Sequence, residues 1–96
     1  MPITFAEAKA IVYAAEAVGW TVGTYKIARD GYEDATHYLV VRGAAEAMAD
    51  DPDARFVIAG GVVPLVDKRT GAIEYVVPHL PGVERRLAAM KRVRGR

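Results

Sequence analysis

Residues 62–78 read Val-Val-Pro-Leu-Val-Asp-Lys-Arg-Thr-Gly-Ala-Ile-Glu-Tyr-Val-Val-Pro. Two runs rich in β-branched and aromatic residues flank a polar segment, which is the pattern of two strands joined by a turn. Asp67 can accept hydrogen bonds from the amides two and three residues further on, and Gly71 can take a positive φ without a Cβ clash. We therefore predict a β-hairpin whose structural turn residues are Asp67, Thr70 and Gly71.

The length and composition of the chain limit its class. With 96 residues the chain can bury one modest core, so we expect a single domain over residues 1–96. A hydrophobic content of 52%, a charged content of 26% and a net charge of +1 are typical of a globular protein. No basic segment followed by an apolar run opens the chain, and no stretch is long enough to span a bilayer. We expect a cytoplasmic protein without membrane contact.

Helix signals stand near both ends of the chain. Residues 4–7, Thr-Phe-Ala-Glu, match the capping box, and apolar residues then recur at three- and four-residue intervals. This pattern predicts an N-terminal helix that ends near Gly19. Residues 80–82, Leu-Pro-Gly, lead into a C-terminal helix whose apolar face includes Leu87 and reaches Val93.

The segment after the first helix predicts a first hairpin. Residues 20–28 and 36–42 have strand composition, and a bulge at Gly23 would reconcile the change of face in the first of them. Residues 29–34 are polar and contain Gly31, so we expect a turn there.

Residues 44–48 are good helix formers, and the Asp-Asp-Pro-Asp stretch at 50–53 predicts the end of a short middle helix. An apolar run at 55–59 predicts another strand before the hairpin. Strands grouped between helices argue for an α+β fold in which an antiparallel sheet of about four strands, built from hairpins, has its helices on one face.

The residues available for chemistry are few. The chain has no Ser and no Cys, so the usual acyl-transfer nucleophiles and thiolate metal sites are absent. His37 and His79 lie far apart in sequence and show no metal-ligand spacing. We expect no metal, no cofactor and no enzymatic activity.

One enzymatic alternative stays open. Met1-Pro2-Ile3 is similar to the start of tautomerase-superfamily proteins, in which a Pro amine acts as general base. A capping box begins at Thr4, and a helix there would carry the Pro2 amine away from a sheet-lined pocket.

Charge is unevenly distributed along the chain. From about residue 82 the sequence holds six Lys or Arg residues and one Glu, whereas the remainder is richer in acidic residues. The basic C-terminal helix and tail could contact nucleic acid, although cations near a helix C-terminus also complement its dipole. We do not expect nucleic acid as the partner, because no aromatic residues are interleaved with the tail to stack on bases.

The hairpin carries a family resemblance. Residues 64–71, Pro-Leu-Val-Asp-Lys-Arg-Thr-Gly, follow Gly60-Gly61 and a helix start of Ile-Thr-Phe-Ala-Glu-Ala at 3–8. This combination resembles the YrhB-domain family, which includes bacterial immunity proteins of polymorphic toxin systems. The resemblance implies a small α+β protein that neutralises a cognate toxin by binding it. The Val-Asp-x-x-Thr-Gly hairpin also resembles PepSY-type domains, which implies protease inhibition as an alternative.

We therefore expect a non-enzymatic, immunity- or antitoxin-like protein that occludes a cognate protein partner. Acidic clusters could provide the partner-binding residues for a basic toxin, because charge complementarity raises the association rate. The candidates are Asp30, Glu33, Asp34, Asp50, Asp51 and Asp53. Alternatives are a small enzyme using the Pro2 amine and a basic-tailed nucleic-acid-binding or phage accessory protein.

Overall fold

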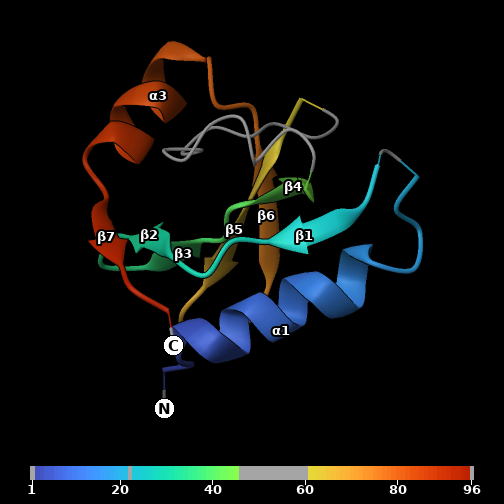
Figure 1. Cartoon of the computed structure of the whole chain (residues 1–96). Helices are drawn as coiled ribbons and strands as arrows, with labels where there is room; N and C mark the ends of the chain where they lie inside the picture. The colour runs from blue at the N-terminus through green and yellow to red at the C-terminus, as the bar shows by residue number, and fades with distance from the viewer. Residues whose placement is uncertain (1, 22, 46–60, 96) are drawn as a thin grey trace.

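The structure of the chain, a computed structural model, describes residues 2–21, 23–45 and 61–95. Within them the fold is α+β, as predicted, with every strand pairing antiparallel (Figure 1). In chain order the elements are α1 (Phe5–Glu16), β1 (Tyr25–Ile27), β2 (Gly31–Glu33), β3 (His37–Leu39), β4 (Arg42–Ala44), β5 (Val63–Asp67), β6 (Ile73–Val76), α3 (Pro81–Ala88) and β7 (Lys91–Val93).

The strands form two sheets. One has five strands in the order β6-β5-β3-β2-β7, and β1 and β4 form a separate two-stranded sheet. This exceeds the predicted sheet of about four strands, because two segments expected to be a turn and a helix supply β2 and β7.

The predicted hairpin is β5 and β6, with Val63 paired to Val76 and Val66 paired to Ile73. Its turn has the expected chemistry. The Asp67 carboxylate accepts hydrogen bonds from the Arg69 and Thr70 amides at 2.7 and 3.0 Å, and Gly71 has a φ of 75°. These contacts confirm the prediction that Asp67 and Gly71 close the turn.

The two helices cover opposite faces of the five-stranded sheet (Figure 1), so the prediction that they share one face is wrong. Val66 packs with Phe5 and Val12 of α1, whereas its neighbour Leu65 packs with Leu87 of α3. Successive side chains of a strand point to opposite faces, and both Leu65 and Val66 are fully buried. A strand that is apolar on both faces needs cover on both.

The start of α1 is as predicted. The Thr4 hydroxyl accepts from the Glu7 amide at 3.1 Å, and the Glu7 carboxylate accepts from the Thr4 amide at 3.0 Å. The helix ends at Glu16, slightly before the predicted stop at Gly19.

The predicted first hairpin exists in a different form. The expected turn over 29–34 contains β2, which pairs with β3, while β1 pairs with β4 (Figure 1). Residues 28–31 on one side of the hairpin face only residues 40 and 41 on the other, so the ribbon bends and divides between two sheets. The strand expected over residues 20–28 is shortened to β1, Tyr25–Ile27. Gly23, where a bulge was expected, lies before β1 and has a φ of 71°.

The C-terminal helix ends at Ala88, and the prediction that it continues to Val93 is wrong. Lys91–Val93 instead forms β7 on the outer edge of β2, with Val93 opposite Gly31. Pairing with an available sheet edge outweighs the helix propensity of Lys91 and Arg92. The helix dipole therefore does not account for the basic residues after Ala88.

Two predicted elements are not addressed by the structure. The middle helix over 44–48 and the strand over 55–59 fall mainly outside the described residues, although Ala44 itself belongs to β4. Neither α1 nor α3, the helices that the described residues form, is long and apolar enough to cross a membrane.

Replacing Gly71 with Val should lower the free energy of unfolding by about 1–3 kcal/mol, because a β-branched residue is forced to a positive φ. Urea denaturation measures this change. The neighbouring exposed residue Ala72 has no positive φ, so Ala72→Val is the matched control and should be nearly neutral. Equal stability of both variants would contradict this account of the turn.

Candidate functional site

A buried ion pair joins α1 to β4. The Arg42 Nε lies 2.9 Å from one carboxylate oxygen of Glu16, and its Nη2 lies 3.0 Å from the other. Only 3% of the Arg42 side chain and 9% of the Glu16 side chain are exposed. This two-pronged geometry is the strong form of the Arg–carboxylate contact and fixes the relative position of the two elements.

The position of Glu16 makes this pair necessary. Glu16 is the last residue of α1, where a negative charge is unfavourable beside the unpaired carbonyls of the helix end, and no basic residue lies in that turn. Arg42 supplies the missing positive charge from β4. Its Nη1 also donates to the Val62 carbonyl at 3.0 Å, and its guanidinium lies 5.9 Å from the centre of the Trp20 ring. One side chain thus links α1, β4 and the approach to β5.

Two tyrosines complete the surroundings of Glu16. The Tyr25 hydroxyl donates to one carboxylate oxygen at 2.9 Å, and the Tyr75 hydroxyl donates to the other at 3.1 Å. Burial and the hydrogen bond to Glu16 raise the pKa of Tyr25 strongly, and burial and the Glu16 charge raise the pKa of Tyr75. The protonated hydroxyl is favoured in both cases because only it can donate to the carboxylate.

These tyrosines belong to a larger group of rings. The Tyr25 ring is 4.8 Å from that of Trp20 and 5.8 Å from that of Tyr13, both in edge-on arrangements. Tyr13 is 59% exposed and Tyr75 is 46% exposed. We call Tyr13, Trp20, Tyr25 and Tyr75 the aromatic surface. Glu16 holds the Tyr25 and Tyr75 hydroxyls, and the Tyr25 ring in turn contacts the Tyr13 and Trp20 rings.

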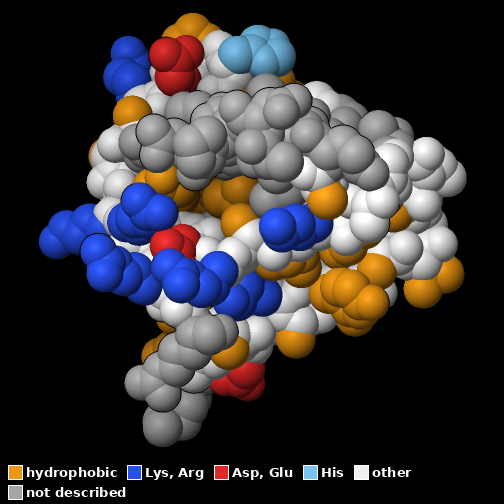
Figure 2. Space-filling view, in the orientation of Figure 1, with side chains coloured by type: hydrophobic (Ala, Val, Ile, Leu, Met, Phe, Trp, Pro, Cys, Tyr) orange, Lys and Arg blue, Asp and Glu red, His pale blue; other side chains and the backbone are white. Residues whose placement is uncertain are grey.

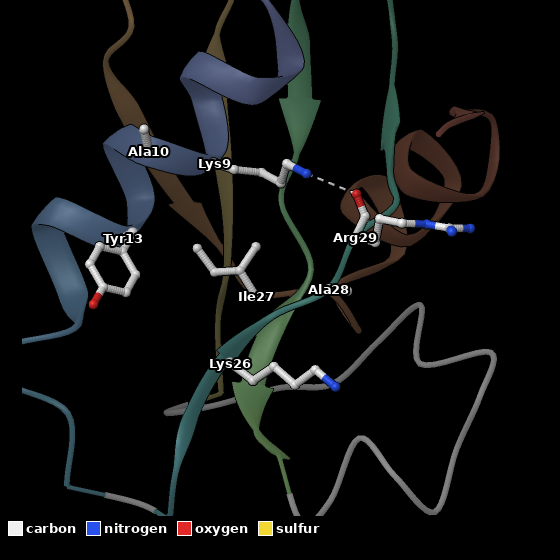
Figure 3. Close-up of a pocket in the computed structure, with 7 residues that line it drawn as sticks. All are labelled: Lys9, Ala10, Tyr13, Lys26, Ile27, Ala28 and Arg29. Carbon is white, nitrogen blue, oxygen red and sulfur yellow. Dashed lines mark hydrogen bonds between the residues drawn. The ribbon is translucent and has the colours of Figure 1, made fainter. Parts of the chain in front are cut away.

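A groove of about 480 Å³ begins at Tyr13 and runs between α1 and β1 (Figure 3). Lys9, Ala10 and Tyr13 line it from α1, and residues 26–29 line it from β1 and the segment that follows. The Lys9 ammonium crosses the end of the groove and donates to the Arg29 carbonyl at 3.0 Å.

Beyond the groove the surface is basic. Figure 2 shows Lys and Arg side chains gathered over β7, β2 and β1, with hydrophobic side chains beside them towards α1. The sheet brings the tail and the first half of the chain together here, because Arg92 of β7 lies opposite Tyr32 of β2. The Asp30 carboxylate accepts from Arg29, from Arg92 and from the Gly95 amide, and the side-chain hydrogen bond from Arg29 and then that from the Gly95 amide lower its pKa to about 2.

Three of the predicted acidic contact residues have cationic partners within the chain. Asp30 is bound as described above, Glu33 lies 2.6 Å from the Lys68 ammonium, and Asp34 lies 3.3 Å from the Arg86 guanidinium. Although burial opposes ionisation of Asp34, hydrogen bonds from the Thr36 backbone and other donors hold its pKa at about 2. The remaining candidates, Asp50, Asp51 and Asp53, lie outside the described residues.

The two histidines lie in different settings. His79 is exposed, whereas His37 contacts Thr36 and Arg86 through Nδ1, at 2.7 and 2.9 Å, and Glu74 through Nε2, at 3.5 Å. His37 thereby ties β3 to both α3 and β6. No group of three His, Asp or Glu side chains within the described ranges is placed to hold a metal ion.

Pro2 is exposed and precedes the first turn of α1. The chain is fixed next to it, because the Ile3 amide donates to the Lys68 carbonyl at 2.8 Å.

Sequence reasoning missed Glu16, Arg42 and the groove. The apolar periodicity of the first helix gives Glu16 no role, and Arg42 stands only at the end of the segment 36–42 that has strand composition. One signal was present: a carboxylate at a helix C-terminus without a nearby cation needs a partner from elsewhere in the chain.

Comparison of the chain with known proteins gives no match to a protein family, to a curated protein or to a solved structure.

The raised tyrosine pKa values predict a loss of stability at alkaline pH. Above the ordinary tyrosine pKa of about 10, the unfolded chain releases these protons while the folded chain keeps them, so the free energy of unfolding falls as pH rises. The midpoint of urea denaturation, measured below and above the ordinary tyrosine pKa, tests this fall in stability. Tyr25→Phe should reduce the slope, whereas Tyr13→Phe, whose hydroxyl does not contact Glu16, should keep it. If both variants lose stability equally with rising pH, the pH dependence does not come from the Tyr25 hydroxyl bound to Glu16.

Proposed function

We propose that this chain is a non-enzymatic binding protein of the immunity type, which neutralises a cognate protein partner by covering its surface. The observation that carries the proposal is the aromatic surface. Tyr and Trp are the residues that most often dominate the binding energy of protein interfaces, and here Tyr13 and Tyr75 are exposed on a rigid support.

The support beneath the rings favours binding. A contact residue that is already fixed loses little conformational entropy when the partner arrives. The hydroxyls of Tyr25 and Tyr75 are anchored to Glu16, and the Tyr13 and Trp20 rings pack on Tyr25. Val18, which is 99% exposed near the end of α1, adds apolar area at the same end of the helix.

The acidic residues receive less support as the contact surface. Asp30, Glu33 and Asp34 each face a cation of this chain, which reduces the field they present to a basic partner. Their role in partner binding stays a prediction, as does that of Asp50, Asp51 and Asp53.

A second candidate function follows from the basic surface. Lys26, Arg29, Lys91, Arg92 and Arg94 are exposed on segments that the sheet brings together, and such a patch can bind phosphates. Asp30, in the midst of this patch, offsets part of its charge.

Partner binding tests the proposal through the aromatic surface. Tyr13→Ala should raise the Kd for a protein partner captured from the native host by about tenfold, since an anchoring aromatic residue contributes more than about 1 kcal/mol. The kinetics are measured by surface plasmon resonance with the purified partner. Leu80 is the matched control, because it is 50% exposed and lies beside α3, so Leu80→Ala should leave the Kd unchanged.

Capture of no protein, or equal affinities of both variants, would overturn the proposal. Salt-dependent binding of an oligonucleotide that is lost in Arg92→Ala would favour the second candidate instead.

A further inference from the structure

The outer edge of β1 has unpaired backbone groups. The Ala28 amide donates to the Val41 carbonyl, and the Ala45 amide donates to the Thr24 carbonyl, both at 2.8 Å. Hydrogen-bonded positions alternate along an antiparallel pair, so the amides and carbonyls of Tyr25 and Ile27 point away from β4. No hydrogen bond joins these groups to any other of the described residues.

The groove lies along this edge. Its β1 side is formed by Lys26 and Ile27, whose side chains point to opposite faces of the strand, and by Ala28 and Arg29 of the segment that follows β1. Because the groove is lined by residues from both faces of β1, it extends beside the strand, and β4 occupies the opposite edge. The contact from Lys9 to the Arg29 carbonyl shows that backbone groups on this side are within reach of α1 (Figure 3).

The two faces of the edge differ in chemistry. Ile27 packs with the core on the α1 side, where Tyr13 also lines the groove. In Figure 3 the Lys26 side chain extends from β1 and the Arg29 side chain extends from the segment after it, both on the side away from Tyr13. Lys26 is exposed, and the Arg29 side chain is 72% exposed. A strand added here would have every second side chain against apolar groups and the others near cations.

We propose that this groove binds an extended segment of a protein partner with alternating apolar and acidic residues, which adds as a third strand to the edge of β1. The inference rests on the proposed binding function and specifies its mode. Backbone hydrogen bonds from Tyr25 and Ile27 would give affinity, and pockets and charges on the two faces would give specificity. The same cations disfavour basic strands, and charged side chains on an exposed edge oppose unspecific pairing.

The probe is a fluorescently labelled peptide of alternating Val and Glu, titrated into the whole chain and followed by anisotropy. It should bind, and its affinity should fall about tenfold in Lys26→Glu, where like charges oppose each other. Arg85→Glu reverses an exposed cation on α3, outside the groove, and should leave the affinity unchanged. A Val–Lys peptide and a Val–Glu peptide methylated on alternate backbone nitrogens should not bind.

Amide hydrogen exchange tests whether the peptide pairs with the outer edge of β1. In the free protein the Tyr25 and Ile27 amides should exchange fast while the Ala28 amide is protected, and the Val–Glu peptide should slow the exchange of the first two. Equal binding of the methylated peptide, or binding without protection of Tyr25 and Ile27, would overturn strand addition.

The proposal that an acidic segment occupies the groove would be overturned if the Val–Glu peptide does not bind. It would also be overturned if a single-stranded oligonucleotide competes for the groove and binds more tightly. The proposed function is judged separately. If a captured partner depends on Tyr13 but binds Lys26→Glu normally and does not protect the β1 edge, the function stands and the groove inference fails.

Discussion

Glu16 places a negative charge at the carbonyl end of α1, and the fold must neutralise that charge in a nearly dry environment. Arg42 does so from β4, which lies far away in sequence, with two parallel contacts to the carboxylate and one to the Val62 carbonyl. A buried charge that lacks its partner costs several kcal/mol, so the pair is stable only when α1, β4 and the start of β5 are assembled together. The contact therefore makes the position of the two-stranded sheet depend on the first helix.

The candidate binding surface follows from this constraint. With β4 fixed on α1, its partner β1 is held beside the helix, and the space between them is the groove. The two hydroxyls bound to Glu16 hold Tyr25 and Tyr75, and Tyr25 in turn supports Tyr13 and Trp20. The interaction that stabilises the fold is thus the same one that organises the exposed rings. A partner would meet a preformed surface, which is the favourable situation for tight binding.

Local signals in the sequence predicted local structure well. The capping box at Thr4 and the turn at Asp67 and Gly71 depend on residues within a few positions of one another, and both are present as expected. The α+β class also followed from the order of the segments. Predictions failed where distant contacts decide the outcome: Val93 belongs to a strand because β2 has an open edge, and residues 31–33 form that strand because β3 and β7 flank it. The two helices separate because β5 is apolar on both faces, which its unbroken apolar run could have indicated.

The candidate site was less accessible to sequence reasoning than the fold. Asp30, Glu33 and Asp34 stood out as an acidic cluster, but apart from Arg29 the cations that bind them, Lys68, Arg86 and Arg92, come from other segments and cannot be located by spacing. Nothing in the local pattern of Arg42 shows that its side chain is buried. The groove depends on the edge of β1 that remains open, and hence on the complete strand order.

A double-mutant cycle on the buried pair tests the central claim most directly. Glu16→Gln, Arg42→Met and the double variant are compared by urea denaturation. Each single change should lower the free energy of unfolding by about 3–5 kcal/mol because it leaves one buried group without its partner, and the double change should cost clearly less than the sum of the two. If the two losses add without coupling, or if each single variant is nearly neutral, then Glu16 and Arg42 do not hold α1 and β4 together and the account is contradicted.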